Sequence, residues 1–384
     1  MINIAAARVL DRYAGYFACL LLSGFKKSSR AALPEAPSKI LVLKFWEGGL
    51  IVMGAPWFRA LKRRYPGAEI HFLTLDVNAQ LAGMTGAAGK VISLRISSGL
   101  PLFFKDLARA LPALRAEKYD LLLDLEFLSR FSAVLTGLAG AACSAGFKKE
   151  GVWRGGFHDI TVPLDLGAHM TANYRAIFGA VGAEAEARDS GPLECEPYVP
   201  EGLKPGERYI VLNYDRKDIM PERAWPRANY EAVLSRLLEA GEYKIAAISQ
   251  RRVEMPERPG LLNLSGRLDY RRLAGLFARA RLFITHDSGP LHIAAAMGCP
   301  TVSIFGPETP AGYAPLGPKH KALYLGLPCS PCIDTLKGKE LNCVRAGNDC
   351  VTGITPEMVL KAAKEVLSGE VEPRHAKVQP RHKI

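Results

Sequence analysis

Three side chains that can bind or polarise a substrate lie close together in the segment 283–310: a carboxylate, a hydroxyl and an imidazole. The apolar, β-branched run 283–285 is typical of a buried parallel strand. Ser288 can cap the next helix, Pro290 suits its first turn and Gly298 suits its end. We therefore expect a strand, a sharp polar turn and a helix, in that order.

The turn between this strand and this helix is a place where an anion can bind. The free N–H groups at a helix start and the helix dipole favour phosphate there. Asp287 does not suit a phosphate cradle but suits sugar or ribose hydroxyls, and His292 can donate to a phosphate oxygen. The same pattern is also typical of an ordinary, well-capped strand–turn–helix unit with a core histidine, since such units are common.

A second group of chemically active residues is a set of four cysteines, Cys329, Cys332, Cys343 and Cys350. Their spacing allows a tetrathiolate zinc site or an iron–sulfur site. The last two cysteines are further apart than in a usual zinc knuckle. A structural metal and simple free or paired thiols both remain open at this point.

The composition restricts the class of protein. The chain has 384 residues, which is enough for two α/β domains, and its net charge is +12. A basic surface can attract nucleic acid, anionic lipid or anionic substrates, but no nucleic-acid-binding motif is present, so we expect no nucleic-acid partner. The eight cysteines are mostly spread singly and no cleavable signal is evident, which indicates a reducing compartment.

The first 30 residues predict an amphipathic helix. The apolar stretch 14–25 is too short to span a bilayer. Apolar residues recur at helical spacing, and three basic residues follow: Leu10, Tyr13, Ala14, Phe17 and Leu21, then Lys26, Lys27 and Arg30. This pattern suits a helix that lies on an anionic membrane surface. A helix that packs on the protein's own body is the alternative.

Strand patterns alternate with helix patterns in two blocks, 38–182 and 208–367. The segment 183–207 is rich in Glu, Pro and Gly, and we interpret it as an interdomain linker; the basic tail 370–384 is expected to be disordered. The alternation predicts two Rossmann-like α/β domains with parallel sheets. Strands are expected at 40–44, 69–75, 91–94, 120–125, 141–147, 209–213, 244–249, 263–265, 283–285 and 301–305. Helices are expected at 51–64, 103–117, 131–138, 169–181, 230–240, 270–280, 290–297 and 356–367.

The segment 285–307, THDSGPLHIAAAMGCPTVSIFGP, resembles the signature segment of glycosyltransferase family 9, the bacterial ADP-heptose:lipopolysaccharide heptosyltransferase family. Further similar segments occur in the same order: ILVLKFWEGGLIVMGAPWFRALKRRYPGAEIHFLT, YDLLLDLEFLSR, Arg-Ala-Trp-Pro at 223–226, NLSGRLDYRRLAGLFARARLFITHDSG and CSPC. The resemblance covers roughly residues 38–367. It implies a GT-B fold, with two Rossmann-like domains facing a central cleft, the acceptor held by the first and the nucleotide sugar mainly by the second.

The resemblance also implies a set of donor-binding residues: Asn213, Tyr214, Arg223, Asp287, Ser288, Gly289 and His292. Arg223 stands where the family has a Lys that is expected to touch the donor diphosphate, and an Arg can grip phosphate with two hydrogen bonds. Asp287 would bind sugar hydroxyls, and the amides of Ser288 and Gly289 would face the diphosphate. The loop 215–218 departs from the family's small-residue turn.

The catalytic base departs from the family pattern. Aligning the first segment puts Leu50 where heptose-transferring members carry an Asp that is thought to deprotonate the acceptor. Glu47 lies in the same loop, which also contains Gly48 and Gly49, and a direct displacement needs one carboxylate near the acceptor oxygen. Glu47 is therefore the candidate base. Asp124 and Glu126, at the end of a predicted strand, are second candidates.

Together these features predict an inverting glycosyltransferase. It would move a sugar, expected to be heptose, from a nucleotide diphosphate sugar, expected to be ADP-heptose, to lipopolysaccharide core or another lipid-linked saccharide. Helix amides and Arg223 can stabilise the leaving diphosphate, so no cofactor is required for catalysis. The expected location is cytoplasmic, peripheral on the inner face of the inner membrane. A nucleotide-sugar epimerase of the same fold and a non-catalytic nucleotide-sugar-binding protein that has lost the Asp are the alternatives.

Overall fold

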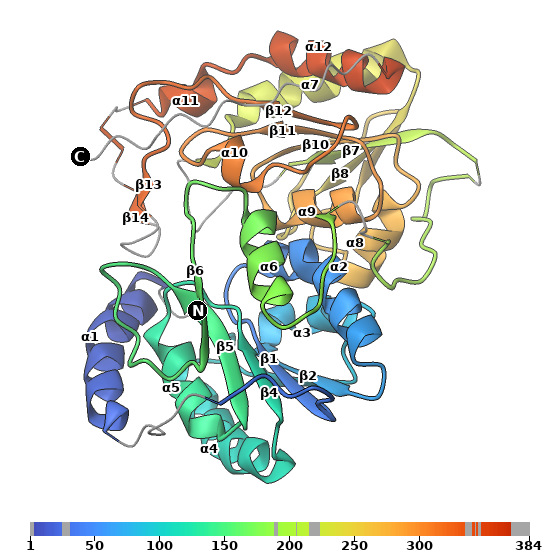
Figure 1. Ribbon diagram of the computed structural model, residues 1–384. Coiled ribbons are helices and arrows are strands. Elements are labelled where there is room, and N and C mark those ends of the chain that lie inside the picture. The colour runs from blue at the N-terminus through green and yellow to red at the C-terminus, as the bar shows by residue number, and fades with distance from the viewer. Residues whose placement is uncertain are drawn as a thin grey trace. The chain divides into compact units, whose positions relative to one another are not determined.

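The chain folds into two compact units, residues 1–189 and 190–384. The computed structural model describes residues 4–24, 31–187, 191–204, 206–214, 223–334, 340–341, 343–344 and 347–369. Each unit is built on one six-stranded parallel sheet with helices packed against it (Figure 1). The expectation of two parallel-sheet α/β domains is therefore confirmed.

The first sheet has the strand order β3-β2-β1-β4-β5-β6. Its central strand β1 consists of apolar residues that are almost all fully buried, as expected of a parallel strand covered on both faces. Chain order reverses between β1 and β4, so their carboxyl ends form the kind of switch point at which ligands bind in α/β folds. The strands are β1 (Lys39–Leu43), β2 (Glu69–Leu75), β3 (Lys90–Leu94), β4 (Leu121–Asp124), β5 (Cys143–Lys148) and β6 (Ile160–Pro163).

The described part of this unit has six helices: α1 (Ile4–Ser23), α2 (Gly48–Arg64), α3 (Asp76–Gly83), α4 (Leu100–Glu117), α5 (Arg130–Ala139) and α6 (Met170–Gly179). Helix α1 lies beside α5 (Figure 1). Among the described residues, no helix combines the length and the apolar character needed to cross a bilayer. A core of aliphatic and aromatic side chains, including Phe45, Phe103, Leu122 and Leu135, fills one side of the sheet.

The second sheet repeats the plan with the order β12-β11-β10-β7-β8-β9. Here chain order reverses between β7 and β10, which brings the carboxyl ends of these two strands together. The strands are β7 (Tyr209–Asn213), β8 (Lys244–Ile248), β9 (Leu261–Asn263), β10 (Leu282–His286), β11 (Thr301–Ile304) and β12 (His320–Leu323). A separate short hairpin pairs β13 (Ile333–Asp334) with β14 (Glu340–Leu341).

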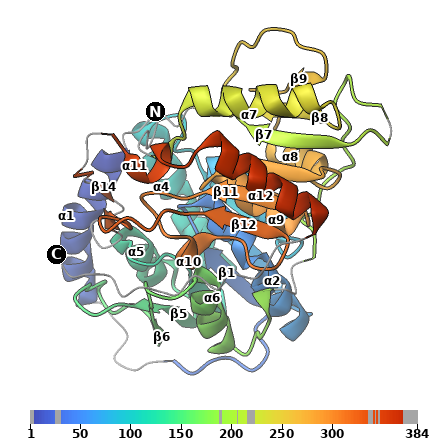
Figure 2. The same cartoon turned by 90° about the horizontal axis from the view of Figure 1, so that it is seen from above.

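The helices of the second unit are α7 (Arg227–Ala240), α8 (Tyr270–Phe277), α9 (Gly289–Ala296), α10 (Pro310–Tyr313), α11 (Asp349–Thr352) and α12 (Pro356–Ser368). The last helix, α12, packs beside α7 and over β10, β11 and β12 (Figure 2). Its residues Val359, Ala362, Ala363 and Val366 complete the core of this unit.

Several observed elements were not expected from the sequence. Helix α3 begins directly where β2 ends, and the edge strands β6 and β12 are short and partly exposed. Residues 191–204 lie with the second unit: Leu193 is buried, and Gly275 of α8 lies against the backbone of Glu196 and Tyr198. The predicted basic tail at 370–384 and the loop 215–222 lie outside the described residues.

Candidate active site

The start of α9 lies at the switch point of the second sheet. Ser288 is the N-cap of α9 in an extended conformation, and its side chain makes no capping bond to the helix. Its hydroxyl lies 3.1 Å from that of Thr285, which in turn accepts a 3.0 Å hydrogen bond from the amide of Asn213. A Cβ atom at Gly289 would meet no other atom within 4 Å. Gly289, in the first turn of α9, is therefore exposed and open on its Cβ side.

Arg223 lies between two carboxylates. Its Nη2 atom is 3.0 Å from Oδ2 of Asp287 and 3.9 Å from Oε2 of Glu308. All three side chains are largely buried, and Glu308 is only 1% exposed. The guanidinium of Arg223 is therefore held beside two carboxylates, where it places a positive charge next to the turn that carries Asp287. The structure thus brings together two of the residues that the sequence singled out.

Glu308 was not found by the sequence reasoning. It follows the Gly306-Pro307 turn after β11, and β11 is the neighbour of β10 in the sheet. Because ligands bind beyond the carboxyl ends of neighbouring parallel strands, the position of Glu308 one strand away from Asp287 was the signal that could have identified it.

His292 is buried within α9, between the core residues Leu291 and Ile293. A second histidine, His286, is fully buried at the end of β10, where its Nδ1 atom lies 2.8 Å from the hydroxyl of Tyr230. Sequence reasoning did not identify this pair. The contact connects the end of β10 to α7 and so helps to fix the turn that carries Asp287.

The side chains of Asn213 and Tyr214 make contacts within their own domain. The Tyr214 hydroxyl donates to a carboxylate oxygen of Glu231 and accepts a 2.9 Å hydrogen bond from Nε of Arg227. Burial, together with the Glu231 contact, raises the pKa of Tyr214. The Tyr214 N–H also donates to the carbonyl of Ile248 at 2.7 Å. These contacts orient the end of β7.

In the first domain, Glu47 occupies a left-handed backbone conformation with φ 63° just before α2. Only two other described non-glycine residues, Lys118 and Asn348, have positive φ. This conformation costs a residue with a Cβ about 1–2 kcal/mol, and such strain is concentrated at functional sites. The Glu47 side chain is half-buried and does not cap α2.

Glu126 holds the loop that carries Glu47. One carboxylate oxygen of Glu126 accepts hydrogen bonds from the N–H of Phe45 at 2.7 Å, the N–H of Trp46 at 3.0 Å and the ammonium of Lys44 at 3.1 Å. The Lys44 ammonium also lies 5.0 Å from the ring centre of Phe127. Glu126, a second candidate for the base, thus uses one of its two carboxylate oxygens to fix the backbone just before Glu47.

Gly48 is closely packed against side chains of α3. The amide of Asn78 donates a 2.6 Å hydrogen bond to the carbonyl of Phe45. A Cβ atom on Gly48 would lie 2.6 Å from Oδ1 of the same Asn78 and 2.8 Å from Leu81. Gly49 follows in the first turn of α2. The loop is therefore packed tightly against α3, the helix that the sequence did not predict.

Leu50, which the resemblance aligns with the family Asp, is only 2% exposed, and its carbonyl accepts a 2.8 Å hydrogen bond from the Tyr174 hydroxyl. The side chain is part of the core under α2. Position 50 therefore carries no carboxylate. The nearest carboxylate residue along the chain is Glu47.

Asp124 is completely buried at the end of β4. Its Oδ2 atom accepts hydrogen bonds from the guanidinium of Arg154, from Ser132 at 3.1 Å and from His158 at 2.9 Å, and its Oδ1 accepts from the N–H of Glu126 at 3.1 Å. Burial raises the pKa of Asp124, but the charge of Arg154 and the contact with His158 outweigh it, so the pKa lies below its usual value. These contacts give Asp124 a role in joining β4 to the neighbouring loops.

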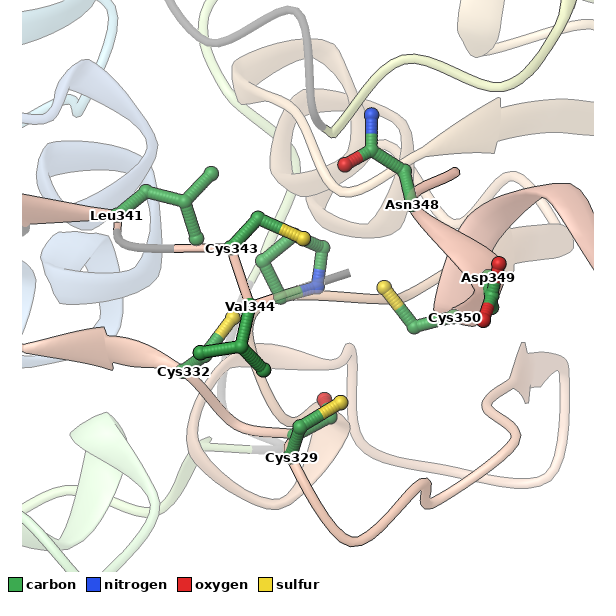
Figure 3. A pocket seen from close by; sticks show the side chains of 10 residues that line it. Cys329, Cys332, Leu341, Cys343, Val344, Asn348, Asp349 and Cys350 are labelled. Carbon is green, nitrogen blue, oxygen red and sulfur yellow. The ribbon is translucent and has the colours of Figure 1, made fainter. Parts of the chain in front are cut away.

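The four cysteines near the C-terminus line one small pocket (Figure 3). Burial and the neighbouring sulfur atoms raise the pKa of Cys332 to about 11 and also raise that of Cys350. Within the described ranges, no three His, Cys, Asp or Glu side chains are arranged to hold a metal ion. A structural zinc or iron–sulfur site at Cys329, Cys332, Cys343 and Cys350, one of the two possibilities that the sequence left open, is therefore not supported by this arrangement.

Comparison with known proteins identifies the class of this chain. Two consecutive parallel-sheet α/β domains are the architecture of the GT-B glycosyltransferases. The structure of E. coli ADP-heptose lps heptosyltransferase II has a TM-score of 0.64 at 22% identity, with 86% of this chain and 99% of the other covered. A family 9 glycosyl transferase from Veillonella parvula has a TM-score of 0.69 at 20% identity over 88% of this chain and 99% of the other. At these identities, the likeness shows the fold alone.

The sequence comparison establishes the family. The model of glycosyltransferase family 9 (heptosyltransferase) matches residues 107–342, which is more than half of the chain. Lipopolysaccharide heptosyltransferase 1 of Pseudomonas aeruginosa is 24% identical over 310 residues, covering 77% of this chain and 86% of the relative. The chain belongs to glycosyltransferase family 9, and it is a glycosyltransferase.

Proposed function

We propose that this chain transfers heptose from ADP-heptose to the saccharide core of lipopolysaccharide. The observation that supports this most directly is the family match together with the heptosyltransferase relatives, one of which aligns with 86% of this chain. In this proposal, residues 38–182 bind the acceptor and residues 208–367 bind the nucleotide sugar.

The donor diphosphate would bind at the start of α9. The N–H groups of Ser288 and Gly289, at the start of α9, would donate hydrogen bonds to the diphosphate, and Arg223 would supply a positive charge from its place beside Asp287. His292, from the same helix, would support the phosphate-binding turn. Asp287 would accept hydrogen bonds from sugar hydroxyls. Asn213 and Tyr214 would position this turn, because their side chains are bonded within the domain.

The transfer would be a single displacement with inversion. The acceptor oxygen forms a bond to the anomeric carbon, the bond from that carbon to the phosphate oxygen breaks, and the electron pair leaves with ADP. The acceptor proton passes to the Glu47 carboxylate. Arg223 and the α9 amides stabilise the negative charge that develops on ADP, so the step requires no cofactor. Gly48 and Gly49 would let the acceptor approach the loop closely.

A thermal-shift series with ADP, GDP, UDP and CDP tests the donor half of the proposal. A ligand that binds only the folded state adds about 2.7 kcal/mol of stability at a hundredfold excess over its dissociation constant. Selective stabilisation by ADP that is lost in Arg223→Ala is the expected result. Stabilisation by another nucleotide would contradict ADP-heptose as the donor, and no response to any of the four would contradict the donor site.

One alternative is favoured by a specific observation. Leu50 is a core residue, and the resemblance aligns it with the family Asp, as would be the case in a nucleotide-sugar-binding protein that no longer catalyses transfer. Release of ADP in the presence of ADP-heptose and an acceptor saccharide separates the two possibilities. Turnover would dismiss the binding protein, whereas tight ADP binding without turnover in any acceptor series would favour it.

We further propose that the enzyme works on the cytoplasmic side of the inner membrane, where it meets a lipid-linked acceptor and an anionic lipid surface. The net charge of +12 supports an anionic lipid surface as a partner, because opposite charges attract. Nucleic acid is not a proposed partner, because the sequence contains no module that binds it.

A further inference from the structure

We infer that the outer face of α1, together with Trp153, is a docking surface for an anionic lipid bilayer. We call this set the α1 outer face: Leu10, Tyr13, Tyr16, Phe17, Leu20, Leu21 and Trp153. The inference rests on the proposed function only for the identity of the membrane, because lipid binding itself needs no turnover. The sequence left two roles open for this helix: contact with a membrane, and packing on the protein. The structure is compatible with both, because one side of α1 packs on the first domain and the opposite side is exposed.

The inner side of α1 is fixed to the first domain by polar contacts. Asp11 accepts hydrogen bonds from the N–H of Phe131 at 2.7 Å, the N–H of Arg130 at 3.1 Å and the hydroxyl of Ser129 at 3.1 Å. It thus caps the N-terminus of α5, where the helix dipole favours a carboxylate. One turn further, Gly15 lies against the side chain of Arg130, and one more turn further Cys19 is fully buried.

The opposite side of α1 is apolar and exposed. Its six side chains recur at helical spacing, with two adjacent pairs at 16–17 and 20–21, and their exposure runs from 42% for Tyr16 to 73% for Leu21. Single exposed apolar residues are ordinary, but a continuous row along one helix marks an interaction site. Because Asp11, Gly15 and Cys19 recur every four residues on the other side, α1 cannot turn this row inward without breaking its contacts with α5.

Aromatic residues extend the row beyond the helix. The ring of Tyr16 lies 5.4 Å from that of Trp153, which is itself exposed, and 6.1 Å from that of Phe17. Tyr and Trp are enriched at the boundary between lipid and water, because their rings have an apolar body and a polar edge. Two separate segments of the domain therefore present interfacial aromatic side chains at one place.

The charges around the α1 outer face select the occupant. The Arg130 guanidinium lies 5.7 Å from the Tyr16 ring, and that of Arg12 lies 5.8 Å from the Tyr13 ring. Lys148 ends β5, and Lys149 and Glu150 follow it in the loop that leads to Trp153. Asp11, the acid within α1, is bonded to α5. This mainly cationic rim complements anionic headgroups. It disfavours a second copy of the chain, which would bring like charges together.

Vesicle flotation of the full chain tests the inference. We expect wild type to float with vesicles of phosphatidylcholine and phosphatidylglycerol and to bind pure phosphatidylcholine at least about tenfold more weakly. The double variant Phe17→Ser/Leu21→Ser should lose at least about tenfold in binding to the anionic vesicles, because it removes two large apolar contacts. Leu316→Ser, which changes an exposed Leu of the other domain, is the matched control and should bind like wild type.

Three outcomes would overturn the inference: no flotation of wild type, equal flotation of the double variant, and equal binding to neutral and anionic vesicles. A concentration-dependent dimer that the double variant abolishes, without vesicle binding, would identify a second copy as the occupant instead. Arg12→Glu provides a second test that leaves the apolar row intact and should weaken binding to anionic vesicles only. The ADP-induced thermal shift of each variant should stay at the wild-type value, so a failure of lipid binding is distinguishable from a failure of the proposed transfer.

Discussion

The Nη2 atom of Arg223 lies 3.0 Å from the Oδ2 atom of Asp287, so the cation expected to bind diphosphate and the carboxylate expected to bind sugar form an ion pair. Each residue therefore orients the other. The nearby Glu308 adds a second negative charge, at 3.9 Å from the same nitrogen. A diphosphate that binds Arg223 must share its guanidinium with these two carboxylates.

The first prediction concerns Arg223. Arg223→Ala should weaken ADP binding by about 10- to 100-fold, because it removes hydrogen bonds to a charged group. Arg223→Lys keeps the charge but not the planar guanidinium, so its affinity for ADP should lie between those of Arg223→Ala and wild type. Isothermal titration with ADP measures both. Arg236→Ala, on the exposed side of α7, is the control, and an equal loss there would contradict a specific role for Arg223.

The second prediction separates catalysis from stability at Glu47. Glu47→Gln should lower kcat by about 100- to 10,000-fold while the protein stays folded. Glu47→Gly should lower kcat equally but raise the free energy of unfolding by about 1 kcal/mol, because glycine tolerates the left-handed backbone. Steady-state kinetics and urea unfolding give the two quantities.

Lys118→Gly is the matched control for this pair, because Lys118 has a φ of 52° at the end of α4. It should show the gain in stability without any loss of kcat. Full turnover in Glu47→Gln would eliminate Glu47 as the base.

The third prediction concerns the packing of Gly48. Gly48→Ala places a Cβ atom 2.6 Å from Oδ1 of Asn78, so it should lower the free energy of unfolding by about 1–3 kcal/mol. Gly83→Ala, at the end of α3, meets nothing within 4 Å and serves as the comparison. Urea unfolding measures both variants. Equal changes in the free energy of unfolding for the two variants would contradict close packing of the loop against α3.

The fourth prediction concerns Asp124. Asp124→Asn removes the negative charge beside Arg154 in the core, so it should cost about 3–5 kcal/mol of unfolding free energy. Asp106→Asn breaks the exposed ion pair with Arg95 and should cost far less. Chemical denaturation of both variants tests this. A stable Asp124→Asn protein with kcat lowered more than a hundredfold would instead support Asp124 as the catalytic base.

The fifth prediction is a pH dependence that arises from His320. Burial, with a smaller contribution from Lys319, lowers the pKa of His320 from 6.5 to about 4. As the pH falls below 6.5, the unfolded chain binds a proton before the folded one does, so stability should fall until about pH 4. His320→Gln should flatten this slope in urea unfolding between pH 7 and 4. An unchanged slope would place its origin elsewhere.

Much of the fold could be predicted because its central strands are continuous apolar runs. The run 40–43 in β1 and the run 282–286 in β10 are fully buried in the structure. The edge strands β6 and β12 were missed because each is short and half-exposed, and so has neither a buried run nor a clean alternation. Helix α3 was missed because it starts with no polar cap: its N-cap is Leu75.

The candidate site was predictable where its chemistry is local in the chain. The turn 285–289 could be recognised from its own residue types. The side chains that bond Asp124 could not, because Arg154 and His158 are 30 and 34 residues away in the chain. Such contacts depend on the order of the strands in the sheet, which cannot be derived from a single sequence. Glu308 and the Tyr230–His286 pair were missed for the same reason.

The order of strands along the chain has a consequence for synthesis. All six strands of the first sheet lie between residues 39 and 163, before any strand of the second sheet has been made. Since domains tend to fold as units while the chain emerges from the ribosome, the first domain can complete its sheet early. The second cannot, because its core waits for α12, the last helix of the described chain. Premature termination shortly before residue 356 would therefore release a protein with one finished half and one half whose core is open to aggregation.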